Sequence, residues 1–327
     1  MTNMPIASSS VGTGIRPCSS RMQHQSYPVS ASRRIVSAIA GTAAIALSLW
    51  GNPAIAGDPF RTTNPHAIGK NTEAAFRAIF ERGDYQGAKK YLSQAEANEP
   101  LSYAMKASLA YMEKDWNALQ TNATKTRETA EQLRKTDPLR GNLYVAVGEF
   151  MEGAYIVSRE GTVRGTPQAL NKLQRVFQSL NAAEKISPQD PELNLVKGFM
   201  DLMLAVNLPF ANPADAVERL NKYAQPRYLA YRGIAIGYRD LNQPTKALEF
   251  ADQALKLTPN NPDLYYLKAQ VLVKQGKNQE SLGFFQKALD KNAQLPRQLR
   301  NQIAYERCRT EFRIDQKARP CDAELKK

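Results

Sequence analysis

The stretch YRGIAIGYRDLNQPTKALEFADQAL at residues 231–255 is followed, 34 residues later, by YYLKAQVLVKQGKNQESLGFFQKAL at residues 265–289. A fixed period of this length is typical of solenoids, in which each unit buries its apolar face only against the next. Pro259 closes the first unit, because proline cannot continue a helix. The two stretches share Tyr231/Tyr265, Ala235/Ala269, Leu248/Leu282, Phe250/Phe284, Ala254/Ala288 and Leu255/Leu289.

The 34-residue unit resembles the tetratricopeptide repeat, a pair of antiparallel helices. The shared alanines fall where the two helices cross closely, and aromatic residues such as Tyr238 and Phe285 fall where the space between helices must be filled. The resemblance implies an all-α, TPR-like α-solenoid of antiparallel helix pairs, with about 13 helices in a single right-handed superhelical domain. By overall organisation the chain also resembles secreted tetratricopeptide-repeat proteins of cyanobacteria, which implies no particular activity.

A further unit opens the repeat region. Phe76 and Ile79 lie on one expected helix, Gly83-Asp84 makes a turn, a second helix follows, and Pro100 closes the unit. The interval from Pro100 to Pro259 leaves room for four units, of which the third is the longest. We therefore expect a lead-in segment at 57–68, a TPR-like superhelical domain at 69–313 and a C-terminal tail at 314–327.

The middle of the chain departs most from the repeat pattern. Helices are expected at 139–158 and 192–208 and a loop at Gly161–Gly165, and the second helix is apolar nearly all round. Such a helix is normally buried on every side. Two interpretations remain open for it: a thick central core, or a pocket for an apolar ligand between the two helices, lined by Phe199, Met200 and Met203.

The first 56 residues differ from the rest, with four arginines and no Asp, Glu or Lys. An apolar run from Ile35 to Trp50 ends at Ala54-Ile55-Ala56, a small-apolar-small triplet. A basic start, a short apolar core and this ending predict a signal peptide at 1–56. An uncleaved anchor is the weaker interpretation, because the run is shorter than a spanning helix. The expected location is the periplasm, with the thylakoid lumen or the extracellular space as alternatives.

The composition excludes most kinds of chemistry. After residue 56 the chain has 40 basic and 31 acidic residues, with no long run of one sign, so a nucleic-acid-binding tail is not indicated. It has one histidine, His66, and no Cys-x-x-Cys pair, phosphate-binding loop or G-x-S-x-G elbow. We expect no enzyme, no cofactor, no metal and no nucleic-acid partner, and no transmembrane segment in the mature chain.

A binding surface is expected on the first helix of each C-terminal unit, where the family's groove lies. Five of its seven residues are cationic, and arginine pairs bidentately with carboxylates, so the column suits an acidic segment or a C-terminal carboxylate. A solvated face of a basic protein is the alternative interpretation. The column consists of Arg232, Arg239, Tyr266, Gln270, Lys274, Arg300 and Arg307.

The C-terminal cysteines and the overall pattern allow two further predictions. Cys308 and Cys321 are the two cysteines that follow the signal-like segment, and an exported compartment permits their oxidation, so we expect a disulfide between them. Fold, export and missing chemistry favour a scaffold or adaptor that mediates protein–protein interaction or assembly in the cell envelope. The alternative is a carrier that binds an apolar ligand between helices 139–158 and 192–208.

The N-terminal segment gives the first testable prediction. Edman sequencing of the native protein should start at Gly57, because signal peptidase cuts after a small-apolar-small triplet. Native protein that retains Ile35 to Trp50 would contradict a cleaved signal peptide.

Overall fold

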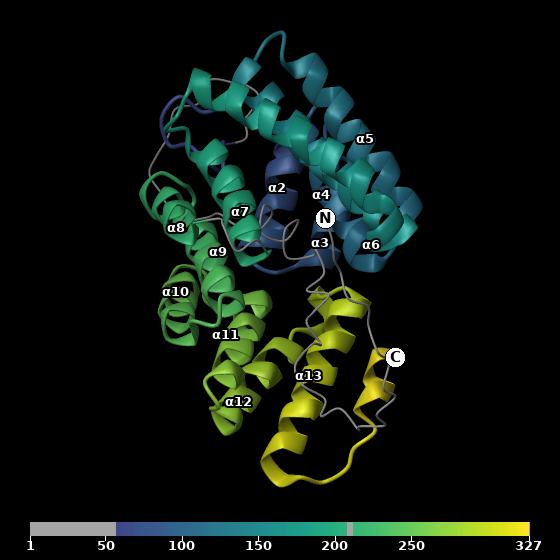
Figure 1. Cartoon of the computed structure of the whole chain (residues 1–327), viewed down its shortest axis with the longest axis vertical. Coiled ribbons are helices and arrows are strands. Elements are labelled where there is room, and N and C mark those ends of the chain that lie inside the picture. The colour runs from purple at the N-terminus through teal and green to yellow at the C-terminus, as the bar shows by residue number, and fades with distance from the viewer. Residues whose placement is uncertain (1–56, 208–211, 327) are drawn as a thin grey trace, which may run out of the picture.

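A computed structural model describes residues 57–207 and 212–326, and the regular structure in these residues is entirely helical (Figure 1). The expected all-helical fold of sequential antiparallel pairs is thereby confirmed. The helices are α2 (Lys70–Phe80), α3 (Tyr85–Ser93), α4 (Pro100–Glu113), α5 (Trp116–Leu133), α6 (Pro138–Ile186), α7 (Pro191–Asn207), α8 (Pro213–Lys222), α9 (Arg227–Asp240), α10 (Pro244–Leu257), α11 (Pro262–Lys274), α12 (Asn278–Leu289) and α13 (Arg297–Asp315), with 3-10 helices η1 (Asn292–Gln294) and η2 (Cys321–Lys326).

The turns between paired helices share one backbone feature, a left-handed residue at a fixed position. The residue directly before the N-cap of the second helix adopts a left-handed conformation in four pairs, at Gly83, Lys114, Asn242 and Gly276, with φ between 58° and 75°. Glycine adopts this conformation at little cost, and asparagine tolerates it. These four residues mark the same position in four repeats, and they provide a common register for comparing them.

The third pair is the two limbs of α6, separated at Gly161, where φ is 77° and ψ is 168°. The expected loop at Gly161–Gly165 is wrong, because helical structure resumes at once and Gly165 lies within the second limb. A side chain at Gly165 would come within 3.1 Å of the Ile156 carbonyl oxygen, so glycine here lets the limbs pack closely. Pro167 lies in the second turn of this limb, where it cannot donate the helical hydrogen bond to the Val163 carbonyl oxygen.

Close contacts also join successive pairs. The Phe199 ring of α7 lies against Gly233 of α9, where an added Cβ would meet it at 1.6 Å, and Leu202 lies against Gly237 in the same way. One contiguous core extends from Phe60 to Ile303. Small residues therefore set the helix spacing, as the sequence pattern predicts.

The two ends of the solenoid touch. The Asn261 side chain, at the start of α11, donates hydrogen bonds to the carbonyl oxygens of Phe80 and Glu81 at 3.2 and 3.1 Å. Gln298 of α13 donates to the Glu113 carbonyl oxygen at 3.0 Å. Carbonyl groups at the end of a helix have no partner within that helix, so Asn261 supplies partners for the end of α2. The C-terminal pairs thus fold back onto the first two pairs.

The C-terminal tail is stapled to α13. Cys308 and Cys321 form a disulfide, as expected from the sequence, and η2 packs along α13, as Figure 1 shows beside the C-terminus. Arg319 also pairs with Asp315 at 2.6 Å. The tail is therefore part of the folded structure.

Removal of the disulfide should destabilise the protein. A 13-residue loop predicts a loss of about 3 kcal/mol in the free energy of unfolding of C308S/C321S, because the cross-link restricts the unfolded chain. Urea denaturation measures this, and dithiothreitol should lower the stability of the wild type but not of the variant. Two free thiols in the native protein, counted by mass under non-reducing conditions, would contradict the disulfide.

Candidate interaction surfaces

The expected cationic column lies on α9, α11 and α13, but its N-terminal end is buried. Arg232 is 4 % exposed and pairs with Asp263 of α11 at 3.0 Å. The Tyr85 hydroxyl of α3 donates a hydrogen bond to the same carboxylate oxygen. The contact between the two ends of the solenoid thus covers Arg232, which a partner cannot reach without opening it.

The middle of the column is neutralised by Glu306 of α13, which the sequence analysis did not single out. The Tyr266 hydroxyl and the Gln270 amide donate to its two carboxylate oxygens at 2.7 and 3.0 Å. Arg239 in turn donates to Gln270 at 2.5 Å and pairs with Asp240 at 2.8 Å. Two features of the sequence could have pointed to Glu306. It directly precedes Arg307 of the column, and at helical spacing it shares a face of α13 with Gln302 and Thr310.

Accessible cations remain at the other end of the column. Lys274 is exposed, and Arg300 and Arg307 are half-buried. Arg307 pairs with Glu311 at 3.1 Å and contacts Gln286. Arg232, Arg239, Tyr266 and Gln270 are thus held in buried or partly buried polar contacts, whereas Lys274, Arg300 and Arg307 remain within reach of solvent.

The three residues of the suggested apolar pocket occupy α7. Phe199 and Met200 are buried in the common core, and Met203 is half-buried. Because the Phe199 ring fills the space in front of Gly233, a ligand there would have to displace a core side chain.

A buried cluster of charges lies where the lead-in segment crosses the starts of α4, α6 and α7. Arg61 pairs with Asp190 at 2.6 Å, with Asp58 at 2.9 Å and with Glu192 at 3.0 Å. The Asp58 carboxylate also accepts hydrogen bonds from the Phe60 and His66 backbone amides. The guanidinium group of Arg61 therefore ties the lead-in segment to the first turn of α7.

Arg140 extends this cluster to α4. It forms a bidentate pair with Glu99, at 2.9 and 3.2 Å, and also donates to Glu192 at 3.3 Å. The Tyr144 hydroxyl donates to Glu192 at 2.6 Å. Burial alone would raise the pKa of Glu192, but the Arg140 and Arg61 guanidinium groups lower it, so the carboxylate stays ionised. Sequence reasoning missed this cluster, because its members are distributed over more than 130 residues.

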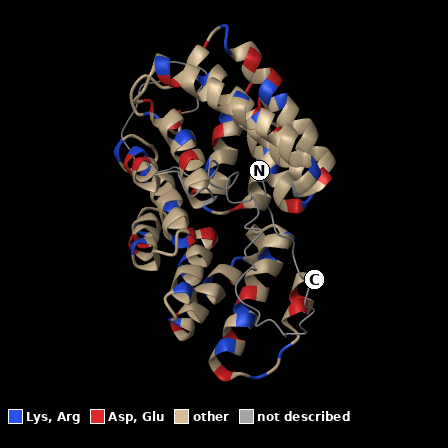
Figure 2. Cartoon of the chain, viewed as in Figure 1, with Lys and Arg blue, Asp and Glu red and all other residues tan. Residues whose placement is uncertain are grey.

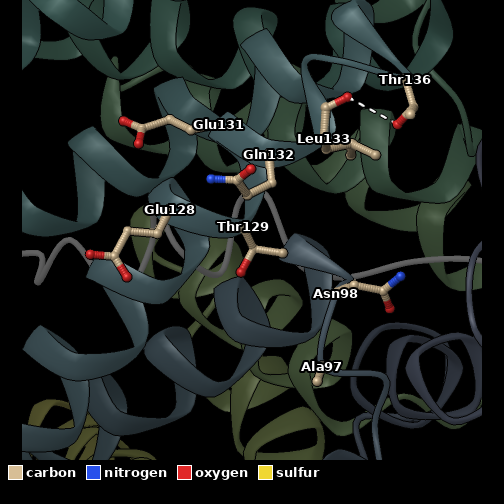
Figure 3. Close-up of a pocket in the computed structure, with 8 residues that line it drawn as sticks. All are labelled: Ala97, Asn98, Glu128, Thr129, Glu131, Gln132, Leu133 and Thr136. Carbon is tan, nitrogen blue, oxygen red and sulfur yellow. Dashed lines mark hydrogen bonds between the residues drawn. The ribbon is translucent and has the colours of Figure 1, made fainter.

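A surface hollow of about 580 Å³ lies between the α3–α4 connection and the end of α5 (Figure 3). The side chains in it do not converge: the Glu128 and Glu131 carboxylates point away from Ala97 and Asn98. Glu131 already pairs with Arg127 at 2.9 Å. The hollow therefore lacks the convergent polar groups of a small-molecule site.

Charges of both signs are interspersed along the helices (Figure 2). In the described residues there is no group of three or more His, Cys, Asp or Glu side chains placed to hold a metal ion. None of the helices in 57–207 and 212–326 has the length and apolar composition needed to cross a bilayer.

Comparison with known families matches residues 232–296 to the tetratricopeptide repeat. The matched segment runs from Arg232 within α9 to Pro296, just before α13, and covers all of the two stretches that show the 34-residue period except Tyr231. No match to this chain was found among curated proteins.

The buried cluster predicts a large effect of one substitution. Arg61→Ala should lower the free energy of unfolding by about 3–5 kcal/mol, because it leaves Asp190 and Glu192 buried with too little positive charge. Arg77→Ala is the matched control: its pair with Glu73 is partly exposed, and its loss should cost about 1 kcal/mol or less. Urea denaturation measures both variants, and equal losses would show that the cluster adds nothing beyond a surface pair.

Proposed function

We propose that this chain is an exported scaffold or adaptor that mediates protein–protein interaction or assembly in the cell envelope. The observation that carries the proposal is the tetratricopeptide repeat at 232–296 within a longer series of antiparallel helix pairs. Repeats of this kind usually bind other proteins and catalyse nothing. A fold alone is weak support for a function, so the proposal depends on the surfaces described above.

Two features support export. The signal-like segment ends at Ala56, and the contacts of Asp58 and Arg61 described above lie after it, so a chain cleaved after Ala56 keeps these contacts. The disulfide between Cys308 and Cys321 is weakly consistent with an oxidising compartment. The periplasm fits both, as do the thylakoid lumen and the extracellular space.

The accessible end of the cationic column is the proposed contact for an acidic partner segment. Lys274, Arg300 and Arg307 remain within reach of solvent, whereas Arg232 and Tyr266 support the column from inside. Exposed ion pairs are screened by salt, since the Debye length is about 10 Å at 0.1 M. Partner binding here should therefore weaken as the salt concentration rises.

The proposal is tested by crosslinked pull-down of the protein from envelope extract, followed by identification of the partners. A specific envelope protein should be recovered in repeat experiments. Recovery of nothing above a charge-matched control protein would contradict the scaffold function.

Substitution of the accessible cations tests the surface. K274Q/R300Q/R307Q should reduce recovery of the partner about threefold or more, because each lost exposed ion pair is worth roughly 0.2–1 kcal/mol. The control K185Q/K256Q/K317Q removes the same charge from exposed lysines elsewhere and should leave recovery unchanged. Equal recovery with both variants would exclude this end of the column from binding.

A further inference from the structure

Two repeats that are far apart in the chain carry one tyrosine and two lysines at corresponding positions. Their register is set by the turns, since Lys114 and Gly276 are both left-handed and lie 162 residues apart. In that register Tyr103, Lys106 and Lys125 correspond to Tyr265, Lys268 and Lys287.

Both arrangements lie between the two helices of a pair, with lysines over aromatic rings. In the α4–α5 pair the ammonium groups of Lys106 and Lys125 lie 4.9 and 5.6 Å from the centre of the Tyr103 ring. In the α11–α12 pair Lys287 lies 5.8 Å from the centre of the Tyr265 ring. Lysine over an aromatic face is attracted by the ring quadrupole, which orients the ammonium group.

The α11–α12 arrangement already holds a carboxylate. Lys268 lies 4.6 Å from the centre of the Phe284 ring and pairs with Asp252, in the preceding helix α10, at 2.6 Å. The arrangement of lysine and aromatic ring therefore accommodates a carboxylate from a neighbouring helix.

The α4–α5 arrangement has no such carboxylate. Asn242 and Gly83 are both left-handed and lie 159 residues apart, so within the preceding pair the position of Asp252 corresponds to Ser93 of α3. Ser93 is exposed, and its hydroxyl donates to the Lys90 carbonyl oxygen.

Lys106 and Lys125 consequently lack an acidic partner among the described residues. Burial and the neighbouring ammonium group of Lys125 lower the pKa of Lys106, and no carboxylate counters them. Two like charges over one ring favour the arrival of an anion.

We propose that Lys106, Lys125 and Tyr103 form a carboxylate-binding site for an acidic segment of a protein partner. A partner carboxylate pairs with Lys106 as Asp252 pairs with Lys268, and the neighbouring ammonium group of Lys125 adds to the attraction. The site rests on the proposed scaffold function for its biological occupant, and it lies apart from the cationic column, on α4 and α5.

The test uses the full chain with an acetylated hexaglutamate peptide and a water-soluble carbodiimide, which joins lysine amines to nearby carboxylates. Mass spectrometry should locate the crosslinks preferentially at Lys106 and Lys125. K106Q/K125Q should bind the fluorescein-labelled peptide about threefold to tenfold more weakly, as expected for the loss of two exposed charge pairs.

Two exchanges between the repeats provide matched controls. S93D supplies the missing carboxylate within the chain, so crosslinks at Lys106 and Lys125 should fall although both lysines remain. D252S removes the carboxylate from the α11–α12 pair, so crosslinks at Lys268 should rise. Circular dichroism and thermal unfolding verify that each variant folds.

The proposal is overturned if crosslinks spread evenly over the exposed lysines, or if S93D leaves those at Lys106 and Lys125 unchanged. It is also overturned if inorganic phosphate displaces the peptide more strongly than chloride at equal ionic strength, which would indicate a phosphate site. An envelope partner recovered equally by wild type and K106Q/K125Q would remove this site while the scaffold function stands. Peptide binding at this site without recovery of any envelope partner would support the site and contradict the scaffold function.

Discussion

The buried pairing of Arg61 and Arg140 with Glu192 is the interaction on which the N-terminal half of the structure depends. Glu192 is fully buried and accepts hydrogen bonds from Arg61, Arg140 and Tyr144. A buried carboxylate without partners would be strongly destabilising, so the elements that carry these groups must assemble together. The acids have a second role, because Glu99 and Asp190 accept hydrogen bonds from backbone amides at the starts of α4 and α7. The charges that join the helices therefore also satisfy N–H groups that have no partner within the helix.

Contact between the two ends of the solenoid decides which surfaces a partner can reach. Asn261 and Asp263 at the start of α11 meet the end of α2 and Tyr85 of α3, and this contact buries Arg232. First-helix side chains of α4, such as Leu101 and Met112, are buried as well. The cations at the other end of the column, on α11 and α13, stay within reach of solvent, as does Lys125 beside Tyr103.

The cationic column was predicted correctly in its position but not in its charge pairing. Its residues do lie on the first helices of the C-terminal pairs and on α13, which the 34-residue register predicts. Which of these cations are paired with carboxylates does not follow from that register, because the carboxylates belong to residues outside the 34-residue pattern. Asp263 reaches Arg232 from the next repeat, and Glu306 meets Tyr266 and Gln270 only when α13 docks on α11. The buried cluster around Glu192 was missed for the same reason: a charged residue gives no local signal of its distant partner.

The sequence by itself determined the helix pairs of the regular repeats, their turns and the C-terminal cross-link, but not the third pair. Each of these is local or periodic: small residues recur where helices cross, prolines begin or follow helices, and two cysteines lie 13 residues apart. Only the tertiary structure decided that α6 breaks at Gly161 alone, that the lead-in segment is held by buried charges, and which lysines and arginines keep no acidic partner. The physical reason is that burial and charge pairing depend on which distant helices meet, and the curvature that brings residue 85 to residue 263 is the sum of small offsets at every repeat.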